Sequence, residues 1–462
     1  MENRSFDHIL GWLKAALSPK IDGLSEGQSV PRDPADASQG SVPITRNGYD
    51  ISPDDPKHDF DSIAIQINSN AMDGFVLDAI QNGHNETNPV SMFDITTAPI
   101  LNTLGLEFAI FDKWFCSIPG PTDPNRAYAM SGTSRGVITN FNGTLWDQQS
   151  YFDYLRQHGR SFAGYYQDDL WALGYFQDML QPENSQYIYD LDEHFFHDVA
   201  EGHLADFVWL QPRMTTLSED SLPTWQHPDA SIREGERFIK QIYEALRAGP
   251  KWNETLFLIT YDEHGGFYDH VSPPDQGIPS PDGMDATNGF QFNQLGVRVP
   301  TIAISPWIPK GTIVGDTFSV AEQPTPTSAF DSTSLLATAN LLLGLTQEGA
   351  APLGDRMAWA NTFAGLVDLL PAPRQDCPLT LPEVPRASPN AWLKQRNLPL
   401  NHHLEAQLLY YCTLHYADLE SKGLCPGRKE ILHNQGLASD WIVKEAAKLR
   451  ATLSERERIA SL

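Results

Sequence analysis

The chain has 462 residues, of which 41% are hydrophobic, and its formal net charge at pH 7 is -27. This length can bury a large core, and it suits either one large α/β domain with an appendage or two domains. The negative charge argues against nucleic-acid binding and against tight docking on anionic membranes, because both depend on clustered Lys and Arg. No run of about 18 apolar residues occurs, so we expect no transmembrane helix.

The amino-terminal stretch starts with polar residues and continues as a helix. Glu2 and Asn3 come first, and apolar residues at helical spacing predict an amphipathic helix over residues 6–17. Rigid elements normally hold functional side chains, so we expect a strand to belong ahead of Glu2. Residues 18–56 are rich in Pro, Gly, Ser and Asp, which predicts an irregular segment. His58 follows, and a lone histidine is more often a surface or capping residue than a functional one.

Short apolar runs rich in β-branched and aromatic residues predict the strands of a sheet. They cover residues 106–111, 162–166, 207–210, 255–261 and 295–308. A strongly periodic helix predicted over 232–247 leads directly into the run at 255–261, and a second helix is predicted over 330–343. Strands that alternate with helices in this way build a parallel sheet, so the predicted fold class is α/β.

The composition shifts towards proline and polar residues at about residue 371. We therefore predict a catalytic domain over residues 1–370, a proline-rich linker or extended wrap over 371–400, and a helical appendage over 401–462. The sequence is compatible both with a secreted protein and with a cytoplasmic protein that contacts a membrane surface.

The four cysteines have no Cys-x-x-Cys spacing, which argues against a zinc knuckle. They are Cys116, Cys377, Cys412 and Cys425. Four free thiols and two disulfide bridges are both compatible with this spacing.

The stretch from Thr260 to Pro274 has the densest titratable chemistry in the chain. Asp262 and Glu263 follow directly after a predicted strand, at the place where α/β folds bind ligands. Two glycines then permit a sharp turn, and Asp269 and His270 come next. An isolated acidic pair is often a helix cap or a solvated turn, but this concentration of acids and imidazoles beside a buried strand favours an active site.

A loop of small residues offers hydroxyl groups. Residues 130–136 contain Ser131, Thr133 and Ser134 between glycines that let a ligand approach the backbone closely. An ordinary polar turn is the alternative interpretation. Together with Glu2-Asn3 and Asp262-Glu263, the loop supplies oxygen ligands of the kind that hard divalent cations prefer. A metal-bound threonine hydroxyl loses its proton more easily and becomes a nucleophile for phosphorus.

Four motifs, in this order along the chain, resemble the phosphoesterase family, whose members include plant non-specific phospholipases C, bacterial phospholipases C and acid phosphatases. The motifs are ENRSFDH at residues 2–8, PTDPNR at 121–126, DEHGGFYDHV at 262–271 and GVRVPTIAISPWI at 296–308. The resemblance implies an alkaline-phosphatase-like α/β fold with a mostly parallel central sheet flanked by helices. It also implies a hydrophobic strand ahead of the Glu-Asn motif.

The resemblance further implies roles for individual residues. A divalent metal of unknown identity, or the phosphate centre, would be bound by Glu2, Asn3, Asp262 and Glu263. Thr133 would be the nucleophile, and His58 and His227 would hold phosphate or assist the leaving group. His270 belongs to the third motif and either touches substrate or anchors its loop.

The expected activity is that of a phospholipase C, which cleaves the glycerol-side phosphodiester bond through a phosphothreonine intermediate. Glu263 and His264 resemble the plant-type lipases rather than the acid phosphatases. An acid phosphatase that acts on phosphomonoesters is the alternative within hydrolases. A phospholipid-binding relative without catalysis is the alternative from another class of protein.

Overall fold

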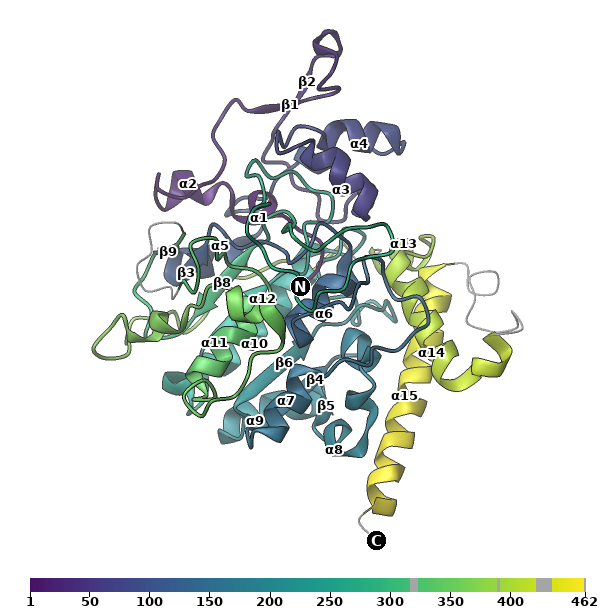
Figure 1. The fold of residues 1–462 in the computed structure, drawn as a ribbon. Coiled ribbons are helices and arrows are strands. Elements are labelled where there is room, and N and C mark those ends of the chain that lie inside the picture. The colour runs from purple at the N-terminus through teal and green to yellow at the C-terminus, as the bar shows by residue number, and fades with distance from the viewer. Residues whose placement is uncertain (316–322, 389–390, 421–433, 461–462) are drawn as a thin grey trace. The chain divides into compact units, whose positions relative to one another are not determined.

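The computed structural model describes residues 1–315, 323–388, 391–420 and 434–460 (Figure 1). The chain divides into two compact units. The first unit combines Met1–Ile138 with Gln226–Arg386, and the second combines Thr139–Trp225 with Ala387–Leu462. Each unit is therefore built from two separate stretches of sequence. The predicted division at residues 370 and 400 stays a prediction.

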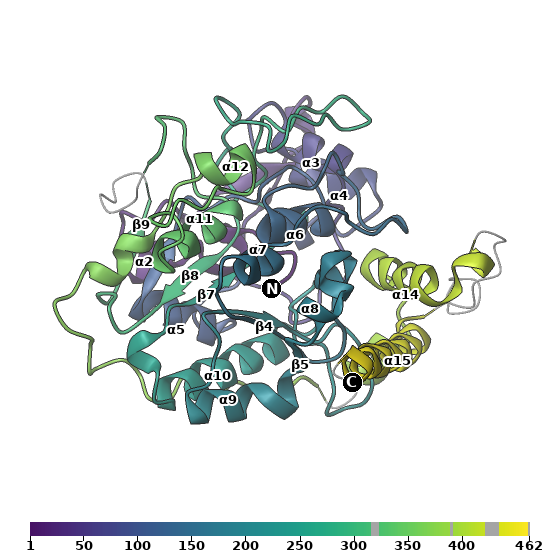
Figure 2. The same ribbon diagram turned by 60° about the horizontal axis from the view of Figure 1, so that its bottom comes forward.

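A four-stranded sheet lies in the first unit, with the strand order β7-β8-β3-β9. Its strands are β3 (Ala109–Phe111), β7 (Phe257–Thr260), β8 (Thr301–Ile304) and β9 (Thr312–Val314). β8 runs antiparallel to both β3 and β7, and Figure 2 shows β7 and β8 side by side. β3 runs parallel to β9. A separate hairpin pairs β1 (Ser29–Pro31) with β2 (Ser41–Pro43).

Helices of the first unit connect these strands. They are α1 (Phe6–Leu10), α2 (Leu13–Ala16), α3 (Phe60–Ile67), α4 (Phe75–Gln81), α5 (Pro99–Glu107), α6 (Thr122–Ser131), α10 (Ile232–Ala248), α11 (Thr333–Leu342) and α12 (Gly354–Trp359). Short 3-10 helices occur at Ala37–Gln39, Asn88–Val90, Trp252–Glu254 and Ala364–Asp368. α10 buries a stripe that includes Phe238, Ile239, Ile242 and Leu246, the pattern of an amphipathic helix on a core.

The second unit contains a parallel three-stranded sheet with the order β5-β4-β6. Its strands are β4 (Phe162–Tyr166), β5 (Ile188–Asp190) and β6 (Phe207–Gln211). Its α-helices are α7 (Tyr151–Gln157), α8 (Pro182–Ser185), α9 (Phe196–Glu201), α13 (Ala391–Arg396), α14 (His402–Glu420) and α15 (Gln435–Ala460). Trp171–Tyr175 and Asp178–Leu180 form 3-10 turns, and Leu191–Phe195 forms a π-helical turn.

The prediction of an α/β fold with parallel strands is confirmed, and several elements differ in extent. The helix predicted over 6–17 is two helices, α1 and α2, which are separated at Gly11, the C-cap of α1. The backbone packs so closely at this cap that a Cβ added to Gly11 would lie 2.7 Å from Asp7 O. The strand predicted over 106–111 begins only at Ala109, since α5 continues to Glu107. The strand predicted over 295–308 is reduced to β8, directly after Pro300.

The structure also bears on the expectations about transmembrane helices and about the cysteines. No helix among the described residues is long and apolar enough to cross a membrane. Cys116 and Cys377 are buried free thiols, while Cys412 is disulfide-bonded, so neither of the two simple cysteine patterns holds. Cys425 lies outside the described residues.

Candidate active site

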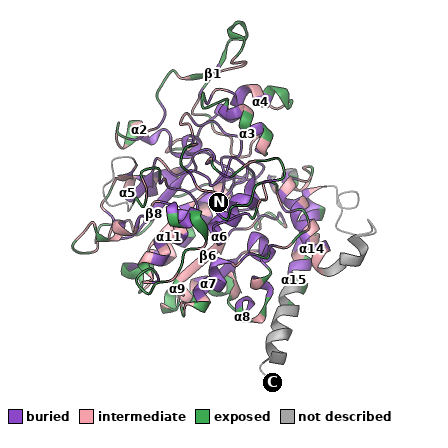
Figure 3. Cartoon of the chain, in the orientation of Figure 1, coloured by how far each residue is buried: buried purple, intermediate pink, exposed green. Residues whose placement is uncertain are grey.

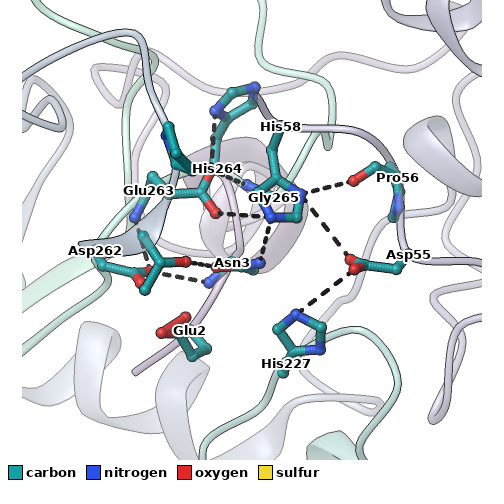
Figure 4. A network of polar contacts seen from close by, with 12 residues as sticks. Glu2, Asn3, Asp55, Pro56, His58, His227, Asp262, Glu263, His264 and Gly265 are labelled. Atoms are coloured by element: carbon teal, nitrogen blue, oxygen red, sulfur yellow. Dashed lines mark hydrogen bonds and ion pairs between the residues drawn. The ribbon is translucent and has the colours of Figure 1, made fainter. Parts of the chain in front are cut away.

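The first residues of the chain run beside the segment that follows β7, within the first unit. Asn3 N donates to Asp262 Oδ1 over 3.1 Å, and Arg4 N donates to Glu263 O over 3.1 Å. All four residues are buried. The structure thus brings together the Glu2-Asn3 and Asp262-Glu263 motifs, which are about 260 residues apart in sequence (Figure 4).

Arg126 on α6 lies between two carboxylates of this cluster. Its Nε and Nη2 atoms donate to Glu2 Oε1 over 3.2 and 3.0 Å, and Nε lies 3.4 Å from Asp262 Oδ2. Burial, reinforced by the charge of Asp262, raises the pKa of Glu2 well above its usual range. Burial also acts to raise the pKa of Asp262, but interactions led by the charge of Arg126 outweigh burial and hold that pKa below its usual value.

Glu263 is the third buried carboxylate. Its Oε2 atom accepts from Gly265 N over 2.7 Å, and its Oε1 atom lies 4.0 Å from His58 Nε2. Burial, followed by the charge of Asp262, raises the pKa of Glu263 well above its usual range. Arg126 thus pairs with Glu2 and Asp262, and Glu263 lies beside Asp262, so the three carboxylates outnumber this guanidinium whenever all three are ionised.

The donor set fits a divalent cation. Glu2 Oε2, Asp262 Oδ2 and Glu263 Oε1 are buried and have no hydrogen-bond partner among the residues that the structure describes. Leaving a buried carboxylate oxygen without a partner costs about 1–3 kcal/mol or more. Mg²⁺, Ca²⁺ and Mn²⁺ prefer carboxylate oxygens as ligands, and a bound cation would favour the ionised forms of Glu2 and Glu263. Glu2, Asp262 and Glu263 are not among the described groups whose ligand atoms all lie within 4.8 Å of one another, so their role as metal ligands stays a prediction.

Asn3 connects this cluster to a hydroxyl and to a histidine. Its Oδ1 atom accepts from Thr122 Oγ1 over 3.3 Å, and its Nδ2 atom lies 3.2 Å from His58 Nε2. Pro56 O can only accept, so His58 Nδ1, 2.7 Å away, carries a proton. Asn3 has a φ of 54°, and a Cβ on Gly265 would lie 2.2 Å from Asn3 O, so this close approach requires glycine.

Thr122 is the first residue of α6, a helix whose ten residues are all buried (purple in Figure 3). The N-terminus of a helix presents free backbone N–H groups and a positive dipole end, which favour an anion. Thr133, the predicted nucleophile, lies just beyond the other end of α6. Its Oγ1 atom donates to Asp282 Oδ2 over 2.7 Å and accepts from Arg135 N over 2.9 Å.

Asp55 lies between the two predicted histidines, as Figure 4 shows. Its carboxylate is 4.0 Å from His58 Nδ1 and 3.8 Å from His227 Nε2. The other ring nitrogen of His227, Nδ1, lies 2.6 Å from Asp229 Oδ1. Burial acts to lower the pKa of His227, but Asp229 and Asp55 outweigh burial and raise it above the usual value.

His270 lies in a separate charge cluster of the same unit. Its Nδ1 atom bonds Asp7 Oδ2 over 2.6 Å and its Nε2 atom bonds Asp22 Oδ1 over 2.9 Å. Burial acts to lower the pKa of His270, but the bonds to Asp22 and Asp7 raise it to about 10. Arg298 joins Asp7 to Asp269, with contacts of 3.2 and 2.9 Å.

This second cluster has ligand atoms of Asp7, Asp269 and His270 within 4.8 Å of one another, an arrangement compatible with a metal. The guanidinium of Arg298 already pairs with both aspartates. His270 therefore holds the third motif to α1 through Asp7 and to the segment after α2 through Asp22, and both of its ring nitrogens face structural carboxylates.

Sequence reasoning missed four residues of the site. They are Asp55, Thr122, Arg126 and Asp229. Thr122 and Arg126 lie inside the PTDPNR motif, so that motif was the signal for both. The two aspartates stand three residues before His58 and two residues after His227, a short spacing that favours a carboxylate–imidazole contact.

Comparisons with known proteins agree with the motifs. Residues 1–346 match the model of the phosphoesterase family. Non-specific phospholipase C6 of Arabidopsis thaliana is 40% identical over an alignment that covers 83% of this chain and 74% of the relative. Non-specific phospholipase C3 of the same plant is 38% identical, with coverages of 84% and 75%.

More distant matches include a bacterial enzyme and a solved structure. Hemolytic phospholipase C of Pseudomonas aeruginosa is 26% identical, with coverages of 76% of this chain and 53% of the relative. A protein in the alkaline phosphatase superfamily from Vibrio parahaemolyticus is a structural neighbour with a TM-score of 0.32, 11% identity, and coverages of 61% and 66%. From the match over residues 1–346 and the plant relatives, the chain belongs to the phosphoesterase family of hydrolases that act on phosphoester bonds.

Proposed function

We propose that the chain is a phospholipase C that cleaves the glycerol-side phosphodiester bond of phospholipids with a threonine nucleophile. The observation that carries this proposal is the Thr122 hydroxyl, which bonds Asn3 at the buried N-terminus of α6 beside the carboxylate cluster. The names of the plant and bacterial relatives support the substrate class.

The geometry favours Thr122 over Thr133 as the nucleophile. Thr122 Oγ1 bonds the same Asn3 side chain that contacts His58, whereas Thr133 Oγ1 donates to Asp282, which stands outside the motifs. A phosphoryl group on Thr122 also meets the positive end of α6, which stabilises its negative charge. Thr133 stays the alternative nucleophile, and matched variants separate the two.

The reaction has two displacement steps. After Thr122 Oγ1 has lost its proton to solvent, it forms a bond to phosphorus while the bond from phosphorus to the glycerol oxygen breaks. His227 gives its Nε2 proton to that oxygen, so diacylglycerol leaves and Thr122 keeps the phosphorylated head group. Water then attacks phosphorus, returns a proton to His227 and frees Thr122, which regains its proton from solvent.

The protonation of His227 suits this role. Asp229 and Asp55 raise the pKa of His227, so at a given pH more of it is in the imidazolium form, which has a proton to donate, than for an ordinary histidine. Its contact with Asp229 also fixes the orientation of the ring. His58, oriented by Pro56 and Asn3, is placed to steady a phosphate oxygen.

A divalent cation is part of this proposal. Glu2, Asn3, Asp262 and Glu263 would hold it, since they supply the buried oxygen atoms. When bound, it would offset charge on the phosphate and lower the pKa of a nearby hydroxyl. Arg126 keeps Glu2 and Asp262 together on the side that faces α6.

Rates on two substrates test the activity. The purified chain is assayed for diacylglycerol release from phosphatidylcholine vesicles and for hydrolysis of p-nitrophenyl phosphate. We expect the phosphodiester to be the better substrate by kcat/KM. A preference for p-nitrophenyl phosphate would identify an acid phosphatase, and vesicle binding without product from either substrate would identify a non-catalytic lipid-binding protein.

A further inference from the structure

Gln226, the residue directly before His227, has a strained backbone in a fully buried position. Its φ is 69°, in the left-handed region, and its side chain is 0% exposed. That conformation costs a residue with a side chain about 1–2 kcal/mol. Strain of this kind persists only where surrounding contacts over-determine the conformation, and such positions cluster at functional sites.

Three neighbours hold Gln226 in this conformation. Its carbonyl oxygen accepts from Arg4 Nε over 2.9 Å, its Oε1 atom accepts from Tyr261 Oη, and its Nε2 atom donates to Ile232 O over 3.1 Å. Arg4 follows Asn3 and Tyr261 precedes Asp262, so two of the three contacts come from residues next to the carboxylate cluster in sequence. Ile232 begins α10.

Gly235 on α10 provides the space for the Gln226 side chain. A Cβ at Gly235 would lie 2.1 Å from Gln226 Cγ and 2.7 Å from Cδ, which is closer than atoms can approach. Gly235 has no positive φ, so its backbone conformation does not require glycine. Glycine inside a helix is about 1 kcal/mol less favourable than alanine. The helix therefore accepts a less stable residue at the one place where Gln226 packs.

We propose that Gln226, seated on Gly235, is a positioning residue that sets the place of the His227 ring against its charged neighbours. These neighbours are Asp229, Asp55 and Arg4. The inference rests on the proposed function, in which His227 is the proton donor. The inference goes beyond the proposed function, because Gln226 acts through the backbone of His227 and contacts no reacting atom.

The test is a cycle of Gly235→Ala, Gln226→Ala and the double variant. We expect each single variant to lower kcat on phosphatidylcholine vesicles by about tenfold or more, with KM within about twofold, because a displaced catalytic group mainly slows the chemical step. The double variant should be no slower than Gln226→Ala, since the atoms that crowd the new methyl group are gone.

A second readout does not depend on activity. Carbon-13 NMR of labelled histidines follows the titration of His227, whose signal is assigned by its loss in His227→Gln. In Gly235→Ala we expect the His227 pKa to fall by about half a unit or more, because the ring moves away from Asp229 and Asp55. This pKa shift is measurable even if the protein does not cleave phospholipid. The experiment therefore distinguishes failure of the positioning proposal from failure of the proposed phospholipase activity.

Gly105→Ala is the matched control. It adds the same methyl group to a buried helix, α5, where the new atom would meet Leu13 Cδ1 at 2.9 Å and Ile110 Cγ2 at 3.0 Å. We expect it to lower the midpoint of thermal unfolding but to leave the His227 titration unchanged. The proposal is overturned if Gly235→Ala keeps the wild-type pKa of His227. It is also overturned if Gly235→Ala and Gly105→Ala lower kcat equally. A double variant whose loss of kcat is the full product of the losses in Gly235→Ala and Gln226→Ala would overturn it as well.

Discussion

Thr122 Oγ1 donates a hydrogen bond to Asn3 Oδ1 over 3.3 Å, although 119 residues separate the two in sequence. The same Asn3 side chain meets His58 Nε2 at 3.2 Å, and the Asn3 backbone donates to Asp262. One residue therefore orients a hydroxyl and an imidazole through its side-chain amide, and a carboxylate through its backbone. The positive φ of Asn3 and its contact with Gly265 fix that amide in place.

Replacement of the Thr122 hydroxyl is expected to abolish turnover. Thr122→Ala removes the proposed nucleophile and one partner of Asn3, so the rate of diacylglycerol release should fall by at least about a thousandfold. Thr122→Ser keeps a hydroxyl at the start of α6 and should retain measurable activity. Thermal unfolding of both variants checks that α6 still folds.

Thr133→Ala is the matched control for this prediction, since it removes the same group at the far end of α6. Its Oγ1 atom bonds Asp282, so we expect a modest loss of stability, about 1 kcal/mol, and turnover within a few-fold of wild type. The opposite pattern, with Thr133→Ala inactive and Thr122→Ala active, would return the nucleophile to Thr133.

The strongly patterned elements could be predicted from the sequence alone. The apolar run at Phe162–Tyr166 forms β4 with the predicted bounds, and the periodic pattern from Ile232 becomes α10. Asp262 and Glu263 lie at the end of β7, as expected of carboxylates after a buried strand. These features depend on local periodicity and on a generic property of α/β sheets.

The remaining features depend on contacts between distant segments. The strand predicted to start at Leu106 was wrong in its first half, because the apolar residues there complete α5 instead. An apolar run of that length is equally compatible with helix and strand. The choice between Thr122 and Thr133 could not be made from the sequence either, since both are hydroxyl residues near glycine or proline and only the fold brings Asn3 to one of them.

Loss of the Asp229 carboxylate is expected to shift the pH dependence of kcat. The pKa of His227 is raised in the folded protein, so its proton is kept to higher pH than on an ordinary histidine, and kcat falls as the pH rises through that pKa. Asp229→Asn removes the carboxylate 2.6 Å from Nδ1, so this fall should move to lower pH by about one unit.

The control for this pH shift is Asp59→Asn. Asp59 caps α3 through Ser62 N, a bond that asparagine can also accept, and its removal changes the net charge equally. We expect its profile to match wild type. An unchanged profile in Asp229→Asn, measured as kcat between pH 5 and 9 on phosphatidylcholine, would mean that His227 is not the titrating acid.

Removal of divalent cations is expected to stop the reaction. Incubation with a chelator should lower diacylglycerol release by at least about a hundredfold, and Mg²⁺, Mn²⁺ or Ca²⁺ added back should restore it. Glu263→Gln removes one charged donor of the cluster and should raise the cation concentration needed for half-maximal rate. Elemental analysis of the protein confirms that the metal has been removed. Full activity of that metal-free protein would show that the reaction needs no divalent cation.

The His270 ion pairs should stabilise the fold in a pH-dependent manner. The folded pKa of about 10 lies above the unfolded value of about 6.5, so the stabilisation is fully present below pH 6.5 and is lost as the pH rises towards 10. His270→Gln removes one of the two ion pairs of Asp7 and leaves the pair with Arg298, so it should cost about 1–3 kcal/mol near neutral pH.

Urea unfolding of wild type and His270→Gln at several pH values between 7 and 10 measures this effect. The difference in unfolding free energy should shrink steadily across that range, because wild-type His270 loses its proton while glutamine has none to lose. His197→Gln is the control, since that side chain is 71% exposed and its pairing with Asp198 is largely screened. A constant difference at all pH values would show that His270 supports α1 by packing rather than by charge.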